Sequence, residues 1–125
     1  MKFELGRSYS RRMITQELGG NYQKFLPFHK GKVVCGLFRK DLNPDAPEEI
    51  LPGDTPEIIR CAKVFAEQKH AIPVFVRIND DDLELEYVGK WKVGRAPNVD
   101  PLQLKARSKR ARRGDISMIL TLEPE

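Results

Sequence analysis

Two runs of alternating residues surround a short polar turn. Residues 83–93 alternate between apolar and polar side chains, and residues 72–78 alternate in the same way before a turn at 79–82. Alternation with period two is typical of a half-buried strand, and two such runs around a polar turn predict a β-hairpin. The longer run places Tyr87 and Trp91 on one face, and Gly89 between them predicts a bend or a bulge. The chain is therefore expected to fold around a sheet that contains this hairpin.

Caps, prolines and apolar runs predict the other elements. They are a short helix at 10–18, a central strand buried on both faces at 32–39, an edge strand at 49–53, a helix from 54 to about 69, a possible helix from 100 to 113 and a closing strand at 116–122. Strands outnumber helices, and the long strands are adjacent in sequence. The pattern predicts an α+β fold, a curved mixed sheet or open β-barrel with flanking helices. The length of 125 residues predicts one domain over 1–125.

Composition and cysteine usage narrow the class of protein. Hydrophobic residues make up 40% of the chain, which is enough for one core. No apolar run approaches the ~20 residues of a membrane span, and the charged N-terminus lacks the apolar region of a secretory signal. Cys35 and Cys61 are too few for a disulfide framework and indicate buried thiols in a reducing compartment. These features predict a cytoplasmic protein that does not enter a membrane.

Charge is unevenly distributed along the chain. Residues 1–40 carry nine basic and two acidic side chains, residues 41–100 carry seven and thirteen, and residues 101–125 carry six and three. The ends are therefore basic and the middle is acidic. If the two ends converge around a concavity, they form a positive face suited to a polyanion. The alternative is a solvated surface without a partner.

The densest cluster of positive charge lies at 105–113. Its six basic side chains are predicted to hold nucleic-acid phosphates: Lys105, Arg107, Lys109, Arg110, Arg112 and Arg113. Arg7, Arg11 and Arg12 form a second cluster with the same predicted role. About six phosphate contacts would cost roughly 10³-fold in affinity between 50 and 200 mM salt. The alternative for 105–113 is a flexible, solvated loop.

A base extruded from a duplex requires aromatic walls and polar groups that read its edge. Asn43 and Asp45 are candidate readers because two prolines hold their loop rigid. Tyr22 and Trp91 are candidate walls, although aromatic side chains of this kind more often belong to the core.

Catalytic and metal chemistry find little support. His29 and His70 have no metal-ligand spacing, and neither cysteine has the electropositive, exposed setting of a reactive thiolate. The acidic residues at 80–86 are better explained as a solvated turn and an outer strand face than as a metal site. The sequence predicts no metal, no cofactor and no catalytic residue.

Several short segments together resemble a known family. They lie at 9–12, 18–20, 31–35, 43–48, 72–75 and 86–89, and they include Tyr-Ser-Arg-Arg, Leu-Gly-Gly and Asn-Pro-Asp-Ala-Pro-Glu. The pattern, which spans about residues 7–122, resembles a module found ahead of HNH nuclease domains in bacterial proteins and is similar to SRA (SET- and RING-associated) and wider PUA-like domains. Such domains are curved sheets with flanking helices that bind DNA, and several flip modified bases. The resemblance adds Tyr9 to the predicted base pocket and supports Arg11 and Arg12. Because no HNH segment follows, it implies a restriction-associated reader that acts alone or with a separate effector nuclease.

The favoured function is therefore a non-catalytic module that reads modified or flipped bases in double-stranded DNA. An RNA-binding PUA-like module is the first alternative, because PUA-like domains commonly bind RNA. A small nuclease is a weaker alternative. A protein-interaction domain that uses the acidic middle of the chain is the fourth.

Overall fold

The structure is a computed structural model, and it describes residues 2–21, 25–79 and 81–125. Eleven elements follow one another along the chain. They are β1 (Ser8–Ser10), α1 (Arg11–Leu18), β2 (Phe28–His29), β3 (Lys32–Val33), β4 (Gly36–Arg39), β5 (Glu49–Ile50), α2 (Pro56–Gln68), β6 (Ile72–Arg77), β7 (Glu84–Val93), α3 (Pro101–Ala111) and β8 (Leu120–Pro124).

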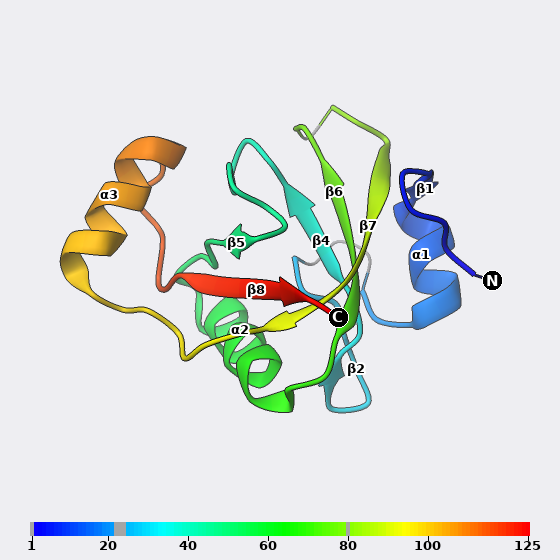
Figure 1. Cartoon of the computed structure of the whole chain (residues 1–125), viewed down its shortest axis with the longest axis horizontal. Coiled ribbons are helices and arrows are strands. Elements are labelled where there is room, and N and C mark those ends of the chain that lie inside the picture. The colour runs from blue at the N-terminus through cyan, green and yellow to red at the C-terminus, as the bar shows by residue number, and fades with distance from the viewer. Residues whose placement is uncertain (1, 22–24, 80) are drawn as a thin grey trace.

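One curved sheet organises the molecule (Figure 1). Its strands lie in the order β4-β6-β7-β8-β5, and β1 pairs with the first half of β7. β4 and β6 are parallel, whereas the other pairs in this sheet are antiparallel. The sheet is mixed and does not close into a barrel, so the predicted α+β class is confirmed. β2 and β3 form a separate two-stranded ribbon.

The long strand β7 contains a bulge where Gly89 predicted one. Pro73 pairs with Lys90 and Phe75 with Tyr87, so one residue of β6 faces two residues of β7. Gly89 has a φ of +100°, a conformation that favours glycine. One extra residue reverses which face each later side chain occupies. The prediction that Tyr87 and Trp91 share a face was therefore wrong.

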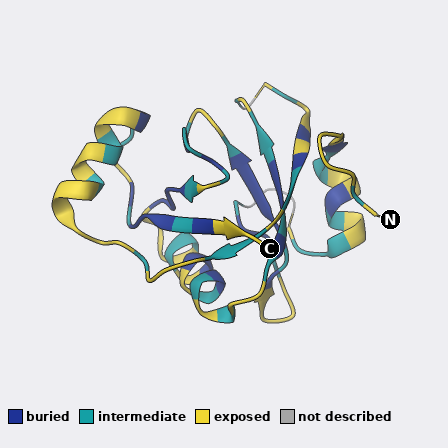
Figure 2. Cartoon of the chain, in the orientation of Figure 1, coloured by how far each residue is buried: buried dark blue, intermediate teal, exposed yellow. Residues whose placement is uncertain are grey.

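Two hydrophobic cores lie on the two faces of the sheet. The α2-side core joins buried residues of α2, such as Phe65, to buried strand residues such as Phe38 and Ile72, and Trp91 packs against it. The α1-side core is smaller and comprises Tyr9, Ile14, Cys35, Leu37, Phe75, Leu85 and Tyr87. Figure 2 shows the resulting stripes of buried residues along the central strands and on the inward faces of α1 and α2.

The three helices begin close to where capping residues predicted them. Side chains of Ser10, Thr55 and Asp100 accept hydrogen bonds from the first turns of α1, α2 and α3. α2 and α3 also have proline in the first turn. Across the described residues, no helix combines the length and the apolar character needed to cross a bilayer.

Two predicted strands needed correction. The run 32–39 is divided into β3 and β4. Val33 exchanges both backbone hydrogen bonds with the side chain of Gln68 at 3.0–3.1 Å, and the Val34 amide donates to the Pro27 carbonyl. β4 also ends the strand order and does not lie at its centre. The closing strand begins at Leu120, since Ser117 bonds to Pro52 and Ile119 forms only an isolated bridge with Asn98. The short strands β1 and β2 were not predicted.

Candidate nucleic-acid interface

Helix α3 projects from one end of the molecule (Figure 1). Ala111 is its one buried residue among those described, and half-buried Leu104 packs against the same small cluster of Leu51, Ile116 and Ile119. Figure 2 shows that most of the helix surface is exposed. The basic run 105–113 is therefore an ordered helix and its C-terminal turn, held to the body along one side.

Three arginines attach this helix to the body. We call Arg107, Arg110 and Arg113 the inner row, because all three side chains bond to the body; Arg107 and Arg110 lie on α3, and Arg113 lies two residues beyond its end. Arg107 donates to both carboxylate oxygens of Glu49, at 2.6 and 3.1 Å, which raises the pKa of Arg107 above its usual value. Arg110 donates to Asp45 at 2.6 Å.

Arg113 is the most enclosed of these side chains. Its side chain is 10% exposed, and Nη1 donates to the carbonyl oxygens of Leu42 and Leu51 at 2.9 and 2.8 Å. Its guanidinium also pairs with Asp115, and this hydrogen bond lowers the pKa of that carboxyl. The counter-anions that the clustered charges require come in part from the protein itself.

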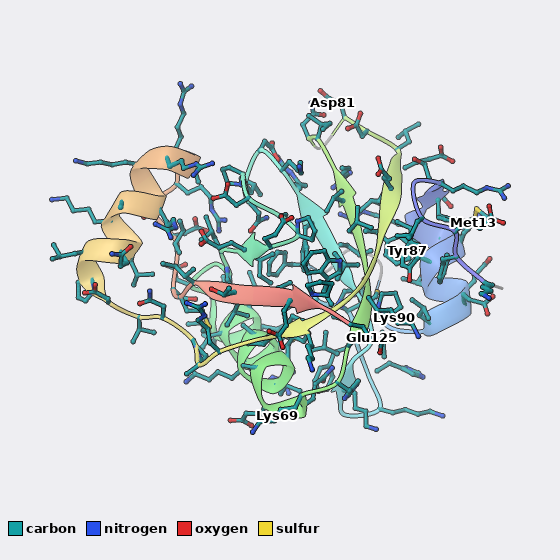
Figure 3. All side chains as sticks on the ribbon, in the orientation of Figure 1. Met13, Lys69, Asp81, Tyr87, Lys90 and Glu125 are labelled. Atoms are coloured by element: carbon teal, nitrogen blue, oxygen red, sulfur yellow. The ribbon has the colours of Figure 1, made fainter. Side chains whose placement is uncertain are left out.

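The other three cations face solvent. We call Lys105, Lys109 and Arg112 the outer row; Lys105 and Lys109 lie one turn apart on α3, Arg112 is its C-cap in the left-handed conformation, and all three are exposed. No acidic residue occurs between 101 and 113. Figure 3 shows nitrogen-tipped side chains extending from α3 away from the sheet. The helix thus presents an uncompensated positive edge on a fixed support.

The loop at 43–47, here called the Pro-rich loop, lies beneath α3. Asn43 is 2% exposed; its Nδ2 donates to Arg39 at 3.0 Å, and its Oδ1 accepts from the Leu51 amide at 2.8 Å. Asp45 forms the ion pair with Arg110. The loop and the basic run meet through the Asp45–Arg110 ion pair, and these two predicted base readers are engaged in holding the loop and the helix.

The remaining predicted pocket residues lie apart from one another. Tyr9 is 4% exposed in the α1-side core, where its hydroxyl accepts from the Glu4 amide at 2.9 Å. Trp91 lies on the opposite face of the sheet and donates to the Val88 carbonyl at 2.9 Å. Tyr22 lies outside the described residues. Among the described residues, the structure does not bring Tyr9 and Trp91 into one pocket with Asn43 and Asp45.

The N-terminal cations do not join those of α3. α1 and α3 lie at opposite ends of the long axis (Figure 1), so the prediction that the basic ends converge was wrong. Arg7 is exposed and lies 3.6 Å from Glu4, and Arg12 is exposed on α1. Arg11 is half-buried and lines a small recess together with Arg39 and Arg77, two arginines that the sequence analysis did not single out.

One large hollow carries the wrong charge for a polyanion. A cavity of about 880 Å³ lies beside the β6–β7 hairpin, whose tip is marked by Asp81 in Figure 3. Its charged lining residues are Lys40, Arg77, Asp81, Asp82, Glu84 and Glu86. Within residues 2–21, 25–79 and 81–125, no group of three or more His, Cys, Asp or Glu side chains is arranged to hold a metal ion. The outer row of α3 therefore remains the best candidate surface.

Comparison with known proteins identifies no relative of this chain. No family model, no curated protein and no solved structure matches the chain significantly.

Proposed function

We propose that this chain is a nucleic-acid-binding module that contacts the phosphate backbone through the outer row of α3. The observation that carries the proposal is the exposure of Lys105, Lys109 and Arg112 on α3 and its C-cap. The other three cations of the run pair with the body, Arg110 through a side chain that is 60% exposed. Phosphate contacts from lysine and arginine supply most of the affinity of nonspecific nucleic-acid binding. A pre-oriented row reduces the ordering cost of such contacts.

The spacing of the outer row suits a single nucleic-acid strand. At 1.5 Å per residue, α3 rises roughly 9 Å from Lys105 to its last residue, Ala111, and Arg112 follows as its C-cap. One strand of a DNA duplex carries a phosphate about every 3.4 Å along the axis, so this length corresponds to about three phosphates. Three exposed cations thus match about three charges.

This count changes the expected salt dependence. Three phosphate contacts give a slope of about −2.7 in a plot of log K against log salt concentration. Affinity should therefore fall about 40-fold between 50 and 200 mM salt. That is less than the roughly 10³-fold expected when all six cations of the run were counted.

The resemblance to SRA and PUA-like modules supports a more specific form of the proposal. In that form the module reads modified or flipped bases in double-stranded DNA as a non-catalytic, cytoplasmic protein, alone or with a separate effector nuclease. The curved mixed sheet with flanking helices is compatible with it. RNA is the alternative ligand, because a basic helix edge contacts either backbone.

The test is a fluorescence-anisotropy titration of a labelled duplex between 50 and 200 mM salt. The variant K105Q/K109Q/R112Q removes the outer row, and K63Q/K69Q/K90Q removes the same charge from exposed lysines elsewhere. We expect the first variant to lose most of the affinity and most of the salt slope. The second should retain a slope near −2.7.

Two results would contradict the proposal. One is equal loss of affinity in both variants, and the other is a wild-type affinity that does not change with salt. Competition by matched RNA, unmodified DNA and base-modified DNA then identifies the preferred ligand. Stronger competition by modified duplex supports the reader, and stronger competition by RNA replaces it with the RNA-binding alternative.

A further inference from the structure

One end of the sheet is left uncovered by the helices. Val76 of β6 and Ser8 of β1 both pair with Glu86 of β7, and residues paired across strands lie on one face of a sheet. Val76 packs against the α2-side core, so this is the α2-side face. Helix α2, however, lies at the far end of the strands from the turn between β6 and β7 (Figure 1). None of the described residues that line the cavity of about 880 Å³ beside this turn, here called the hairpin hollow, belongs to a helix.

The hairpin hollow contains exposed apolar side chains. Val76 and Val88 line it and are half-buried, whereas Ile78 and Leu83 lie on either side of the turn and are exposed, Leu83 to 88%. Large apolar side chains that gather around a hollow and have polar neighbours are typical of an interaction site. The uncovered end of the sheet therefore has the apolar part of a docking surface.

The same hollow is negatively charged. Its described lining includes four carboxylates and two cations: Asp81, Asp82, Glu84, Glu86, Lys40 and Arg77. Asp82 is engaged within the turn, because its carboxylate accepts from the Ile78 amide and its carbonyl from Arg77, both at 3.0 Å. Glu84 and Glu86 are exposed and lie two residues apart in β7, so they share a face. A segment that carries both cations and apolar side chains would complement this surface.

Helix α3 of this chain is such a segment. Leu102, Lys105 and Lys109 follow the spacing i, i+3, i+7 and therefore lie on one face of the helix. Leu102 is 76% exposed, and no acidic residue occurs between 101 and 113. Arg112, the C-cap, adds a further exposed cation. The helix thus presents one exposed apolar side chain and three cations, which complement the apolar and acidic side chains of the hairpin hollow.

The two complementary surfaces border the same loop. In the Pro-rich loop, Asp45 pairs with Arg110 of α3, and Pro47 lines the hairpin hollow. Figure 1 shows the chain between β4 and β5 lying between α3 and the tips of β6 and β7. No described residue of α3 lines the hollow of its own chain. When two copies are related by a two-fold axis, a contact from the α3 of one copy to the hollow of the other is repeated in the opposite direction.

We propose that the hairpin hollow binds α3 of a second copy of this chain, in a reciprocal two-fold dimer. Leu102 of one copy packs against Ile78 and Leu83 of the other, and the outer row faces Glu84 and Glu86. Salt weakens this dimer, because its charged contacts lie at exposed positions. The dimer covers the outer row, so it also competes with nucleic acid; this competition rests on the proposed function, whereas the dimer itself does not.

The test is sedimentation velocity of the whole chain over a dilution series, without nucleic acid, at about 50 mM and about 500 mM salt. The variants are E84K/E86K, K105E/K109E and the combination of all four substitutions. Each pair alone places like charges against each other and should raise the dimer dissociation constant at least about tenfold. The combination restores opposite charges and should return the dissociation constant to within about threefold of the wild type. K63E/K69E, which makes the same charge change on α2, should associate as the wild type does.

Several results would overturn this proposal. They are a wild type that stays monomeric up to roughly 1 mM, species larger than a dimer, and a combined variant as monomeric as its two parents. Binding of polylysine by a wild type that stays monomeric would instead assign the hollow to another cationic partner.

The dimer and the proposed function fail separately. E84K/E86K retains the outer row, so it should lose the dimer and still bind duplex. A wild type that forms the dimer but does not bind duplex would contradict only the proposed function. A wild type that binds duplex and stays monomeric would contradict only the dimer.

Discussion

Two neighbouring arginine–aspartate pairs use the same side chain in opposite ways. In each pair the aspartate follows two residues after the arginine: Asp41 pairs with Arg39 beside a small recess, and Asp115 pairs with Arg113 beneath α3. Arg39 faces a cavity, whereas Arg113 donates to two backbone carbonyls and supports a helix that carries other cations. Sequence proximity of Arg and Asp therefore does not define a role; what surrounds the guanidinium does.

Shape separates the two surfaces as well. The outer row of α3 is an exposed edge, open to a ligand that continues past it in both directions. The recess that Arg11, Arg39 and Arg77 line has a volume of about 210 Å³, which limits the size of what enters. An extended polyanion suits the first surface, whereas only a compact group fits the second.

The strongest test of this comparison exchanges two adjacent arginines for glutamine: Arg112, the C-cap of α3, and Arg113, the residue after it. R113Q removes hydrogen bonds to two carbonyls from a side chain that is 10% exposed, and we expect a loss of about 2–3 kcal/mol in the free energy of unfolding. R112Q should leave stability within about 0.5 kcal/mol and reduce duplex affinity. Urea denaturation and anisotropy measure the two effects. Similar stability losses in both variants would remove the distinction between inner and outer rows.

A smaller effect is expected when an inner-row arginine loses its acidic partner. E49Q removes the carboxylate that pairs with Arg107 and leaves that positive charge beside the outer row. The salt slope should approach −3.6, so that affinity falls about 150-fold between 50 and 200 mM salt. Titration of E49Q against E48Q, which loses the same charge from an exposed neighbour, provides the comparison. An unchanged slope would mean that Arg107 stays outside the interface even without its partner.

The smallest effect concerns stability at acid pH, where the two arginine–aspartate pairs should behave alike. The pKa values of Asp41 and Asp115 are lowered from 3.8, first by hydrogen bonds from Arg39 and Arg113. The folded pKa lies below the unfolded pKa. Both carboxylates therefore stabilise the fold fully at pH values above the unfolded pKa, and this stabilisation is lost as the pH falls through the folded pKa. The effect is small because both carboxylates are partly exposed.

Denaturation of the wild type, D41N, D115N and the double variant between pH 6 and pH 3 tests this expectation. Each substitution should remove part of the decline in stability below about pH 4. An identical decline in the double variant would show that neither pair contributes.

Local signals predicted the helices and the hairpin well. Ser10, Thr55 with Pro56, and Asp100 with Pro101 identify helix starts because capping and proline act through neighbouring residues. The position of the bulge followed from Gly89, but its effect on later side chains did not. The division of 32–39 was not predicted, and the Gln68 side chain that bonds to the Val33 backbone is distant in sequence.

The candidate site was predictable only in part. The basic run at 105–113 was visible, and its helical spacing could have separated inner from outer cations. Its partners Glu49 and Asp45 come from another part of the chain, so no local pattern identifies them. Likewise, Arg39 and Arg77 become neighbours only through a parallel pairing that a sequence does not specify. Asn43 was predicted to read a base, whereas its burial and its two hydrogen bonds assign it to holding the Pro-rich loop.

The single inserted residue at 88–89 has a consequence for how the whole molecule unfolds. Because it turns the strand over midway, Leu85 and Tyr87 pack in one core and Trp91 against the other. The single strand β7 therefore belongs to both cores, and unfolding of either core disrupts the strand pairing that the other core needs. Both halves are thereby coupled into one cooperative transition, and the supports of the two arginine-rich surfaces are lost together.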